Sequence, residues 1–289
     1  MRIEDVRNIA VIGSGIMGSG IAQVCALAGY RVAMRDIGEA YLQKGMEAIR
    51  SSLRKGVERG KLRQEQADAA LAGIRTTLNL AETVKEADVV IEAVPENIEL
   101  KKQVFKELDE LSPEDAILAT NTSSFSITEI ASATKRPDRV VGIHFFNPVP
   151  IMNLVEVIRG VSTSDQTVQI VRDLATRVGK TPVEVNEAPG FVVNRLLAPF
   201  LNEAIFCLME GTAEAKDIDT AIKLGLNHPM GPLELADLVG LDTTLAILDY
   251  MHKETGDPKY RPCPLLRKMV RAGHLGRKSG RGFYEYAAR

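Results

Sequence analysis

The chain has 289 residues, 45% of them hydrophobic, which is enough to bury one large core or two moderate ones. Its 36 basic and 38 acidic side chains are mixed along the sequence and leave a formal net charge of -2, so no basic tail for nucleic acid is expected. No apolar stretch approaches the roughly 18 residues of a membrane span. Three scattered cysteines without a CxxC pair favour a reducing compartment. We therefore expect a cytoplasmic globular protein with no membrane, nucleic-acid or metal partner. The sequence as given would not reveal an organellar pre-sequence that had been removed.

Strand and helix patterns alternate over the first two thirds of the chain. Short apolar runs separated by helical patterns indicate a parallel sheet covered on both faces, and this βαβ order is expected to persist to about residue 187. A charged stretch, residues 38–62, has apolar residues at helical spacing and predicts a pair of helices standing off the sheet. The predicted strands are residues 8–13, 30–36, 76–80, 87–94, 116–122, 139–146, 154–160 and 181–185. The other predicted helices are residues 21–29, 99–111, 126–133 and 167–179.

The character of the sequence changes near Ala188, after which glycine and proline interrupt helical patterns and no strand pattern returns before the tail. The helical patterns are residues 191–211, 213–225, 231–256 and 264–273. We therefore predict an α/β fold with two domains. Residues 1–187 form a Rossmann-like, doubly wound, mostly parallel sheet domain, and residues 188–289 form an all-helical C-terminal domain for substrate binding and dimerisation.

A GxGxxG motif follows the first predicted strand and opens a helix, which is the context that makes this short motif informative. The first glycine makes the tight turn, the second lets backbone approach a pyrophosphate, and the third lets helix and strand pack closely. Amide groups at the helix N-terminus then face the phosphates. The residues expected to contact the dinucleotide here are Gly13, Gly15, Ile16, Met17 and Gly18. The alternative is a set of glycines that serve only ordinary turns.

Asp36 ends the next predicted strand, at the distance where a carboxylate can accept hydrogen bonds from the adenosine ribose hydroxyls. A carboxylate there would repel a 2′-phosphate, so the sequence predicts NAD as the cofactor and makes NADP the less favoured one. Arg31 and Arg35 lie nearby and would weaken this preference, although surface solvation is their simpler role.

Oxidising a secondary alcohol by hydride transfer needs a base for the hydroxyl proton, and histidine titrates in the right range. His144 alone among four histidines follows a sheet strand at the carboxyl end, where doubly wound sheets place their ligands. Glu156 lies in the next apolar stretch, where a carboxylate needs a partner, and a histidine would supply one. Glu156 would fix the imidazole tautomer and stabilise the protonated ring.

Further polar side chains are placed near the same edge of the sheet. Asn121 and the hydroxyls of residues 122–124, Ser123 among them, end another strand and offer groups for a substrate oxygen, and Asn194 lies in the first helix of the second domain. Each has a structural alternative, because strand-end histidines are often structural and Ser123 or Asn194 could simply cap a loop or a helix surface. His228, His252 and His274 keep that structural interpretation.

At these residues the sequence resembles the L-3-hydroxyacyl-CoA dehydrogenase family, and within it the stand-alone bacterial branch that acts on 3-hydroxybutyryl-CoA. The resemblance covers essentially the whole chain. It is carried by VIGSGIMGSGIAQ, VIEAVPEN, TNTSSFSITEIA, HFFNPVPIMNLVEVIRG, EAPGFVVNRLL, LNHPMGPLELADLVGLD and LGRKSGRGFYEY. One departure is Phe125, where the family commonly shows leucine after SNTSS, and this residue would alter packing beside the acyl pocket.

The resemblance implies reversible NAD-dependent oxidation of an (S)-3-hydroxyacyl-CoA to a 3-ketoacyl-CoA in fatty acid and butanoate metabolism. His144 would be the general base or acid, Glu156 its partner, and Ser123 and Asn194 the groups that hold the substrate oxygen. The cofactor contacts expected beyond the glycine turn are Glu96, Lys101, Asn121, Ser123, Asn147 and Lys278. For Glu96, Lys101, Asn147 and Lys278 the alternative is an ordinary surface charge or turn former.

The resemblance also implies that coenzyme A lies along the charged helix pair, with Ser52 and Arg59 as its contacts, and that the chain forms a homodimer. Where the family often has lysine, Arg59 keeps the charge and changes the geometry. Two other functions stay open on the residues alone: a related dehydrogenase of a free hydroxy acid or sugar acid, and a dinucleotide-binding protein without turnover.

Overall fold

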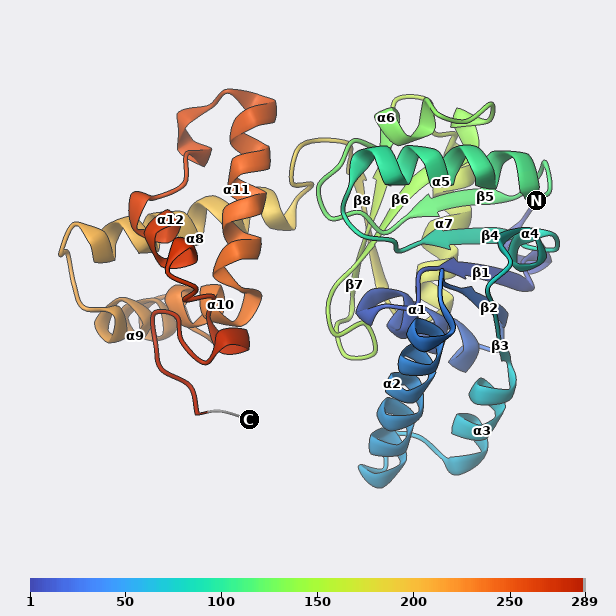
Figure 1. Cartoon of the computed structure of the whole chain (residues 1–289), viewed down its shortest axis with the longest axis horizontal. Coiled ribbons are helices and arrows are strands. Elements are labelled where there is room, and N and C mark those ends of the chain that lie inside the picture. Colours follow the sequence, from blue (N-terminus) through green and yellow to red (C-terminus); the bar gives the residue numbers. More distant parts are fainter. Residues whose placement is uncertain (288–289) are drawn as a thin grey trace. The chain divides into compact units, whose positions relative to one another are not determined.

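A computed structural model of the chain describes residues 1–287 and divides it into two compact units, Met1–Ala188 and Pro189–Arg289 (Figure 1). The first unit contains one eight-stranded sheet in the order β3-β2-β1-β4-β5-β6-β7-β8. Its strands are β1 Asn8–Ile12, β2 Arg31–Arg35, β3 Ile74–Thr77, β4 Val89–Glu92, β5 Ile117–Thr120, β6 Val140–Phe145, β7 Leu154–Arg159 and β8 Thr181–Asn186. Every neighbouring pair is parallel except β6 and β7, so the predicted mostly parallel, Rossmann-like sheet is confirmed.

Seven α-helices connect or cover these strands. They are α1 Ile16–Leu27, α2 Glu39–Glu58, α3 Gln64–Ala72, α4 Leu80–Val84, α5 Ile98–Leu111, α6 Ile127–Ala131 and α7 Asp165–Arg177. Side chains alternate between the two faces of a strand, yet the central strands are buried at every position, which is the burial expected when helices cover both faces.

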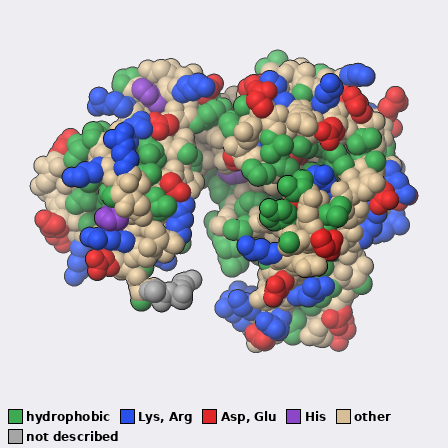
Figure 2. All heavy atoms as spheres, viewed as in Figure 1, with side chains coloured by type: hydrophobic (Ala, Val, Ile, Leu, Met, Phe, Trp, Pro, Cys, Tyr) green, Lys and Arg blue, Asp and Glu red, His purple; other side chains and the backbone are tan. Residues whose placement is uncertain are grey.

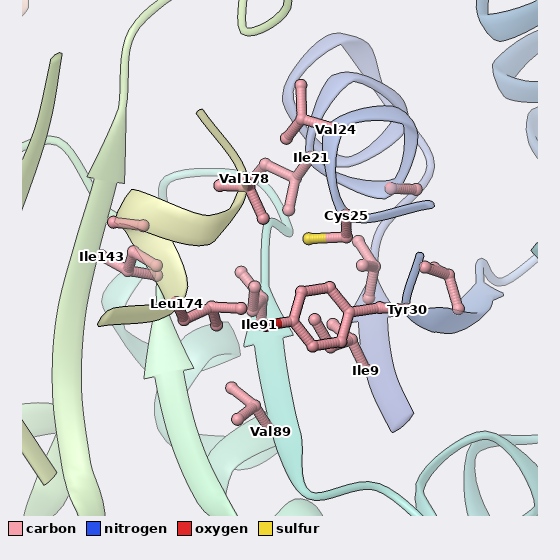
Figure 3. Packing of buried hydrophobic residues seen from close by; sticks show 14 of the residues in the cluster. Ile9, Ile21, Val24, Cys25, Tyr30, Val89, Ile91, Ile143, Leu174 and Val178 are labelled. Carbon is pink, nitrogen blue, oxygen red and sulfur yellow. The ribbon is translucent and has the colours of Figure 1, made fainter. Parts of the chain in front are cut away.

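One face of the sheet packs against α1 and α7. Figure 3 shows Ile21 and Cys25 of α1 and Leu174 of α7 converging on strand residues that include Ile9 and Ile143, all within one cluster of buried side chains. Burial raises the pKa of the Cys25 thiol to about 12, so this cysteine is a small apolar core residue at neutral pH.

Three expectations about the first unit are wrong in detail. Residues 38–62 contain only one helix, α2, which ends at Glu58, and the second helix of the pair is α3, because the chain reverses at Gly60 with φ +66°. The strand expected at residues 76–80 ends at Thr77, since Asn79 accepts a hydrogen bond from the Glu82 amide and caps α4. The βαβ order does not persist to residue 187, because a loop without a helix joins β6 to β7 and makes them antiparallel.

The second unit is helical throughout its described core. Its α-helices are α8 Val193–Met209, α9 Ala215–Gly225, α10 Pro232–Val239, α11 Leu241–Thr255 and α12 Pro264–Arg271. Two buried carboxylates hold the tail against this bundle. Asp237 accepts hydrogen bonds from the Phe283 and Tyr284 amides and from the Tyr286 hydroxyl, while Asp219 accepts one from the Tyr284 hydroxyl. These bonds fix the segment that carries Lys278.

Candidate active site

The glycine turn between β1 and α1 has the geometry that a pyrophosphate requires. Gly13 has φ +102°, and a Cβ there would lie 2.6 Å from the Ala93 carbonyl oxygen. A Cβ on Gly18 would lie 1.8 Å from the Gly13 carbonyl oxygen, so helix and turn touch through bare backbone. At Gly15 a Cβ would meet nothing within 4 Å, which leaves this side of the turn open at the N-terminus of α1. The turn therefore fits a dinucleotide phosphate at the helix N-terminus.

Asp36, just after β2, has a second task that the sequence did not predict. Its Oδ2 accepts hydrogen bonds of 2.7 Å from both the amide and the hydroxyl of Ser14, inside the glycine turn. Its Oδ1 accepts one from the Ile37 amide at 2.7 Å. Asp36 thus holds the shape of the turn besides standing where a ribose is expected.

The candidate catalytic pair is formed by the register of the one antiparallel strand pair. His144 of β6 lies directly opposite Glu156 of β7, and Nδ1 of the ring is 2.7 Å from Oε2 of the carboxylate. The two residues are only 6% and 1% exposed, so this hydrogen bond is largely shielded from water. The Phe146 ring contacts the imidazole with 4.4 Å between centroids. With a carboxylate on Nδ1, the proton of the neutral ring belongs there, and Nε2 becomes the nitrogen that can exchange a proton.

A second cluster joins the ends of β4 and β5. Glu96 accepts hydrogen bonds from the Ser123 amide at 2.6 Å, from the Ser123 hydroxyl at 3.1 Å and from the Thr122 hydroxyl at 3.0 Å. Lys101 of α5 is 1% exposed and lies beneath this cluster, with Nζ 2.7 Å from Glu92 Oε1 and 3.5 Å from Glu96 Oε2. Lys101 is buried and contacts the two acids, so it is placed to affect a ligand through them. Glu96 and Ser123 lie side by side, as a binding site would require.

Two asparagines flank the end of β6. The Asn121 Oδ1 accepts a hydrogen bond from the Phe145 amide at 2.9 Å, so this side chain ties β5 to the residue beside His144. Asn147 is exposed in the loop that follows β6 and precedes a cis proline. Both lie at the carboxyl edge of the sheet, where the sequence predicted them.

The predicted residues of the second unit are Asn194, in the first turn of α8, and Lys278. Lys278 forms an ion pair with Asp242, its Nζ 2.6 Å from Oδ1. Partial burial opposes ionisation of Asp242, but the hydrogen bonds from Lys278 and from backbone amides outweigh it and lower the pKa of this carboxyl. The contributions of both residues to a site stay predictions.

The predicted coenzyme A contacts lie on α2, which projects from the sheet together with α3 (Figure 1). A groove of about 1180 Å³ runs between these helices and is lined by Arg50 and Ser51 among others, but not by Ser52 or Arg59. Ser52 is half-buried, and Arg59 is exposed at the C-terminal end of α2. Figure 2 shows basic side chains near this end of the first unit, among acidic ones.

Sequence reasoning missed Glu92 and Phe146. Glu92 is fully buried although it ionises in water, and it binds both Lys101 and Thr120. A signal was present, because an acid inside the apolar run VVIEAV needs a partner by the argument used for Glu156. Phe146 carried no such signal, since its contact with His144 depends on the turn after β6.

Comparison with known proteins shows the family to which the chain belongs. Residues 8–188 match the model of the 3-hydroxyacyl-CoA dehydrogenase NAD binding domain, and residues 190–286 match that of the 3-hydroxyacyl-CoA dehydrogenase C-terminal domain. The chain belongs to the 3-hydroxyacyl-CoA dehydrogenase family. It is 52% identical to a probable 3-hydroxybutyryl-CoA dehydrogenase of Bacillus subtilis, over 98% of each chain. It is 46% identical to the human mitochondrial hydroxyacyl-coenzyme A dehydrogenase, over 97% of this chain and 91% of the human one.

A solved structure shows the same fold. The (S)-3-hydroxybutyryl-CoA dehydrogenase of Ralstonia eutropha superposes with a TM-score of 0.95 at 49% identity, over 98% of this chain and 100% of the other. These matches confirm the predicted family, the predicted fold class and the prediction of an NAD-dependent dehydrogenase. Among residues 1–287, no helix is long and apolar enough to cross a membrane, and no group of three His, Cys, Asp or Glu side chains could hold a metal ion.

Proposed function

We propose that this protein catalyses the reversible NAD-dependent oxidation of (S)-3-hydroxyacyl-CoA to 3-ketoacyl-CoA, with 3-hydroxybutyryl-CoA as its short-chain substrate. The observation that carries the proposal is the buried His144–Glu156 pair at the same edge of the sheet as the open glycine turn. Close relatives with this fold are named for 3-hydroxybutyryl-CoA, which supports the choice of substrate.

In this mechanism the glycine turn would hold NAD, whose nicotinamide ring would supply the acceptor for the hydride from C3 of the substrate. Nε2 of His144 takes the proton of the 3-hydroxyl group, because Nδ1 is engaged by Glu156. The Glu156 carboxylate stabilises the positive charge that then develops on the ring. Ser123 holds the substrate oxygen, and in the reverse direction His144 returns the proton to it.

The experiment that tests the function is an NADH absorbance assay with acetoacetyl-CoA, run beside free acetoacetate. We expect oxidation of NADH with the thioester and little with the free acid. Equal rates with both would favour a dehydrogenase of free hydroxy acids, and no turnover with either would favour a dinucleotide-binding protein without catalysis. A series of longer 3-ketoacyl-CoA esters then measures the chain length that the pocket beside Phe125 accepts.

The cofactor preference in this proposal is NAD over NADP, and Asp36 is the residue expected to set it. Replacing Asp36 with Asn should raise the ratio of kcat/KM with NADPH to kcat/KM with NADH by about tenfold, because the charge that repels a 2′-phosphate is removed. The amide oxygen can still accept a hydrogen bond from Ser14, which limits damage to the turn. An unchanged ratio in steady-state assays would assign the preference to other residues.

Gly45 provides a second test of the cofactor site. A Cβ there would lie 2.6 Å from the Ser14 carbonyl oxygen, so α2 touches the glycine turn through this residue. Replacing Gly45 with Ala should displace the turn and weaken NADH binding by about tenfold, measured by fluorescence titration. The matched control is Gly56→Ala on the same helix, whose Cβ would meet only the flexible Leu62 side chain at 2.8 Å. Equal NADH affinities for the two variants would contradict the expected role of the turn.

Coenzyme A is proposed to lie along α2, where Ser52 and Arg59 are the expected contacts. The support is the exposed cation at the end of the helix and the half-buried hydroxyl 7 residues earlier, which together suit a phosphorylated ligand. Replacing Arg59 by Ala and measuring KM for acetoacetyl-CoA tests this placement. A raised KM would support binding along this face of α2, and an unchanged KM would favour the groove on the α3 side.

We also propose a homodimer formed through the second unit, in the cytoplasm. Large apolar side chains of this unit are exposed in the single chain: Leu196 is 69% exposed, Leu224 81% and Leu226 60%. Such side chains are typical of a surface that a second copy covers. Light scattering coupled to size exclusion would give the mass of one chain if no dimer forms.

A further inference from the structure

Glu92 is a fully buried carboxylate at the carboxyl end of β4. It lies in register with Thr120 of β5, and the Thr120 hydroxyl donates a hydrogen bond to Glu92 Oε2 at 2.7 Å. The Val94 amide and Lys101 Nζ both donate to Oε1, each at 2.7 Å. Burying a charge is costly unless it is paired and hydrogen-bonded, and here both carboxylate oxygens are engaged. This part of the sheet is therefore built around a charge that the proposed mechanism does not use.

Lys101 is shared between two acids of different depth. Its ammonium group is 1% exposed and lies 2.7 Å from the buried Glu92 but 3.5 Å from Glu96, which reaches the surface. Lys101 Nζ also donates a hydrogen bond to the Val94 carbonyl oxygen, at 3.3 Å. The ammonium is thus drawn toward the sheet and away from Glu96.

The position of Lys101 decides what Glu96 can bind. Glu96 Oε1 accepts from both the amide and the hydroxyl of Ser123, while Oε2 is the oxygen nearer Lys101. Coulomb attraction rises as charges approach, and it is strong where water is excluded. If Lys101 lost Glu92, its best remaining partner would be Glu96, and closing that 3.5 Å gap would pull the carboxylate away from Ser123.

We infer that Glu92 is a positioning residue, which binds Lys101 so that the Glu96 carboxylate stays directed at Ser123. This inference rests on the proposed function for the importance of Ser123 and extends it to a residue that touches neither substrate nor cofactor. Glu92 acts indirectly, because its carboxylate neutralises the buried ammonium group of Lys101. Lys101 therefore does not draw Glu96 away, and the Glu96 carboxylate stays bonded to Ser123.

The test is the isosteric variant Glu92→Gln, assayed with saturating NADH and acetoacetyl-CoA. We expect kcat to fall by about tenfold or more, since a coupled charge is lost. A crystal structure of the variant should show Lys101 Nζ closer to Glu96 and the bonds from Glu96 to Ser123 broken. Adding Lys101→Met removes the competing cation, so a crystal structure of the double variant should show the bonds from Glu96 to Ser123 restored. If Glu92→Gln does not fold, Glu92→Asp serves in its place, because its side chain is one methylene shorter and holds the carboxylate farther from Lys101.

The matched control is Asp88→Asn at the opposite end of β4, where Asp88 binds the Arg7 and Asn8 amides. It should lower stability without changing kcat. The inference is overturned if Glu92→Gln keeps the kcat of the wild type, if the bonds from Glu96 to Ser123 survive in its crystal structure, or if the double variant does not restore them. A wild-type chain that turns over no acyl-CoA would refute the proposed function, and the crystal structures would still decide the role of Glu92.

Discussion

Replacing His144 with Gln should lower kcat for acetoacetyl-CoA reduction by about 10²–10⁴-fold, the range that one general acid or base contributes. Glutamine fills a similar volume and can form hydrogen bonds, but it cannot exchange a proton at the pH of the assay. NADH should still bind, because the glycine turn and the residue that holds it, Asp36, are untouched. Stopped-flow or steady-state absorbance gives kcat, and fluorescence titration gives the NADH affinity.

The control for this variant is His274→Gln, a histidine of the second unit for which we expect a structural role only. It should keep the turnover of the wild type. A His144→Gln variant with nearly normal kcat would remove the histidine from the chemistry and with it the proposed mechanism. A variant that loses NADH binding as well as turnover would instead show that His144 supports the fold of the cofactor site.

Local patterns were sufficient to predict the parts of the site that depend on neighbouring residues in the sequence. The glycine turn was predictable because Gly13 and Gly18 follow a β-branched strand and open a helix, so strand, turn and helix specify one another. The pairing of His144 with Glu156 followed from a desolvation argument, since Glu156 lies in an apolar strand and needs a partner. The structure shows the hydrogen bond, while the catalytic role of the pair stays a prediction.

Contacts between elements distant in the sequence were not predictable in the same way. Spacing alone does not tell whether two consecutive strands run parallel, so the antiparallel register that places His144 opposite Glu156 came only from the structure. The bonds from Ser14 to Asp36 and from Lys101 to Glu92 join different strands and helices, and their geometry depends on how those elements pack. The predicted helix boundaries were wrong for a related reason. The charged periodic pattern continues through α2 and α3, and a single glycine turn separates the two helices.

Replacing Glu156 with Gln should lower kcat/KM by about 10²-fold or more, although the side chain keeps its shape. The glutamine amide can donate to Nδ1 of His144, which places the ring proton on the wrong nitrogen for accepting the substrate proton. The protonated ring also loses the buried negative charge that stabilises it, because Glu156 is 1% exposed and water cannot replace the carboxylate.

Measuring both directions of the reaction makes this prediction sharper. A variant enzyme cannot change the equilibrium constant, so at one pH the values of kcat/KM for the two acyl-CoA substrates must fall by the same factor when the dissociation constants of NAD and NADH are unchanged, and unequal factors would show that cofactor binding has changed. The control is Glu184→Gln on the adjacent strand β8, where an exposed carboxylate has its pKa lowered by the hydrogen bond from Arg159. That variant should leave kcat/KM unchanged, since exposed ion pairs contribute little. If Glu156→Gln keeps the wild-type kcat/KM, the buried carboxylate does not support the proton transfer, and the role proposed for Glu156 is wrong.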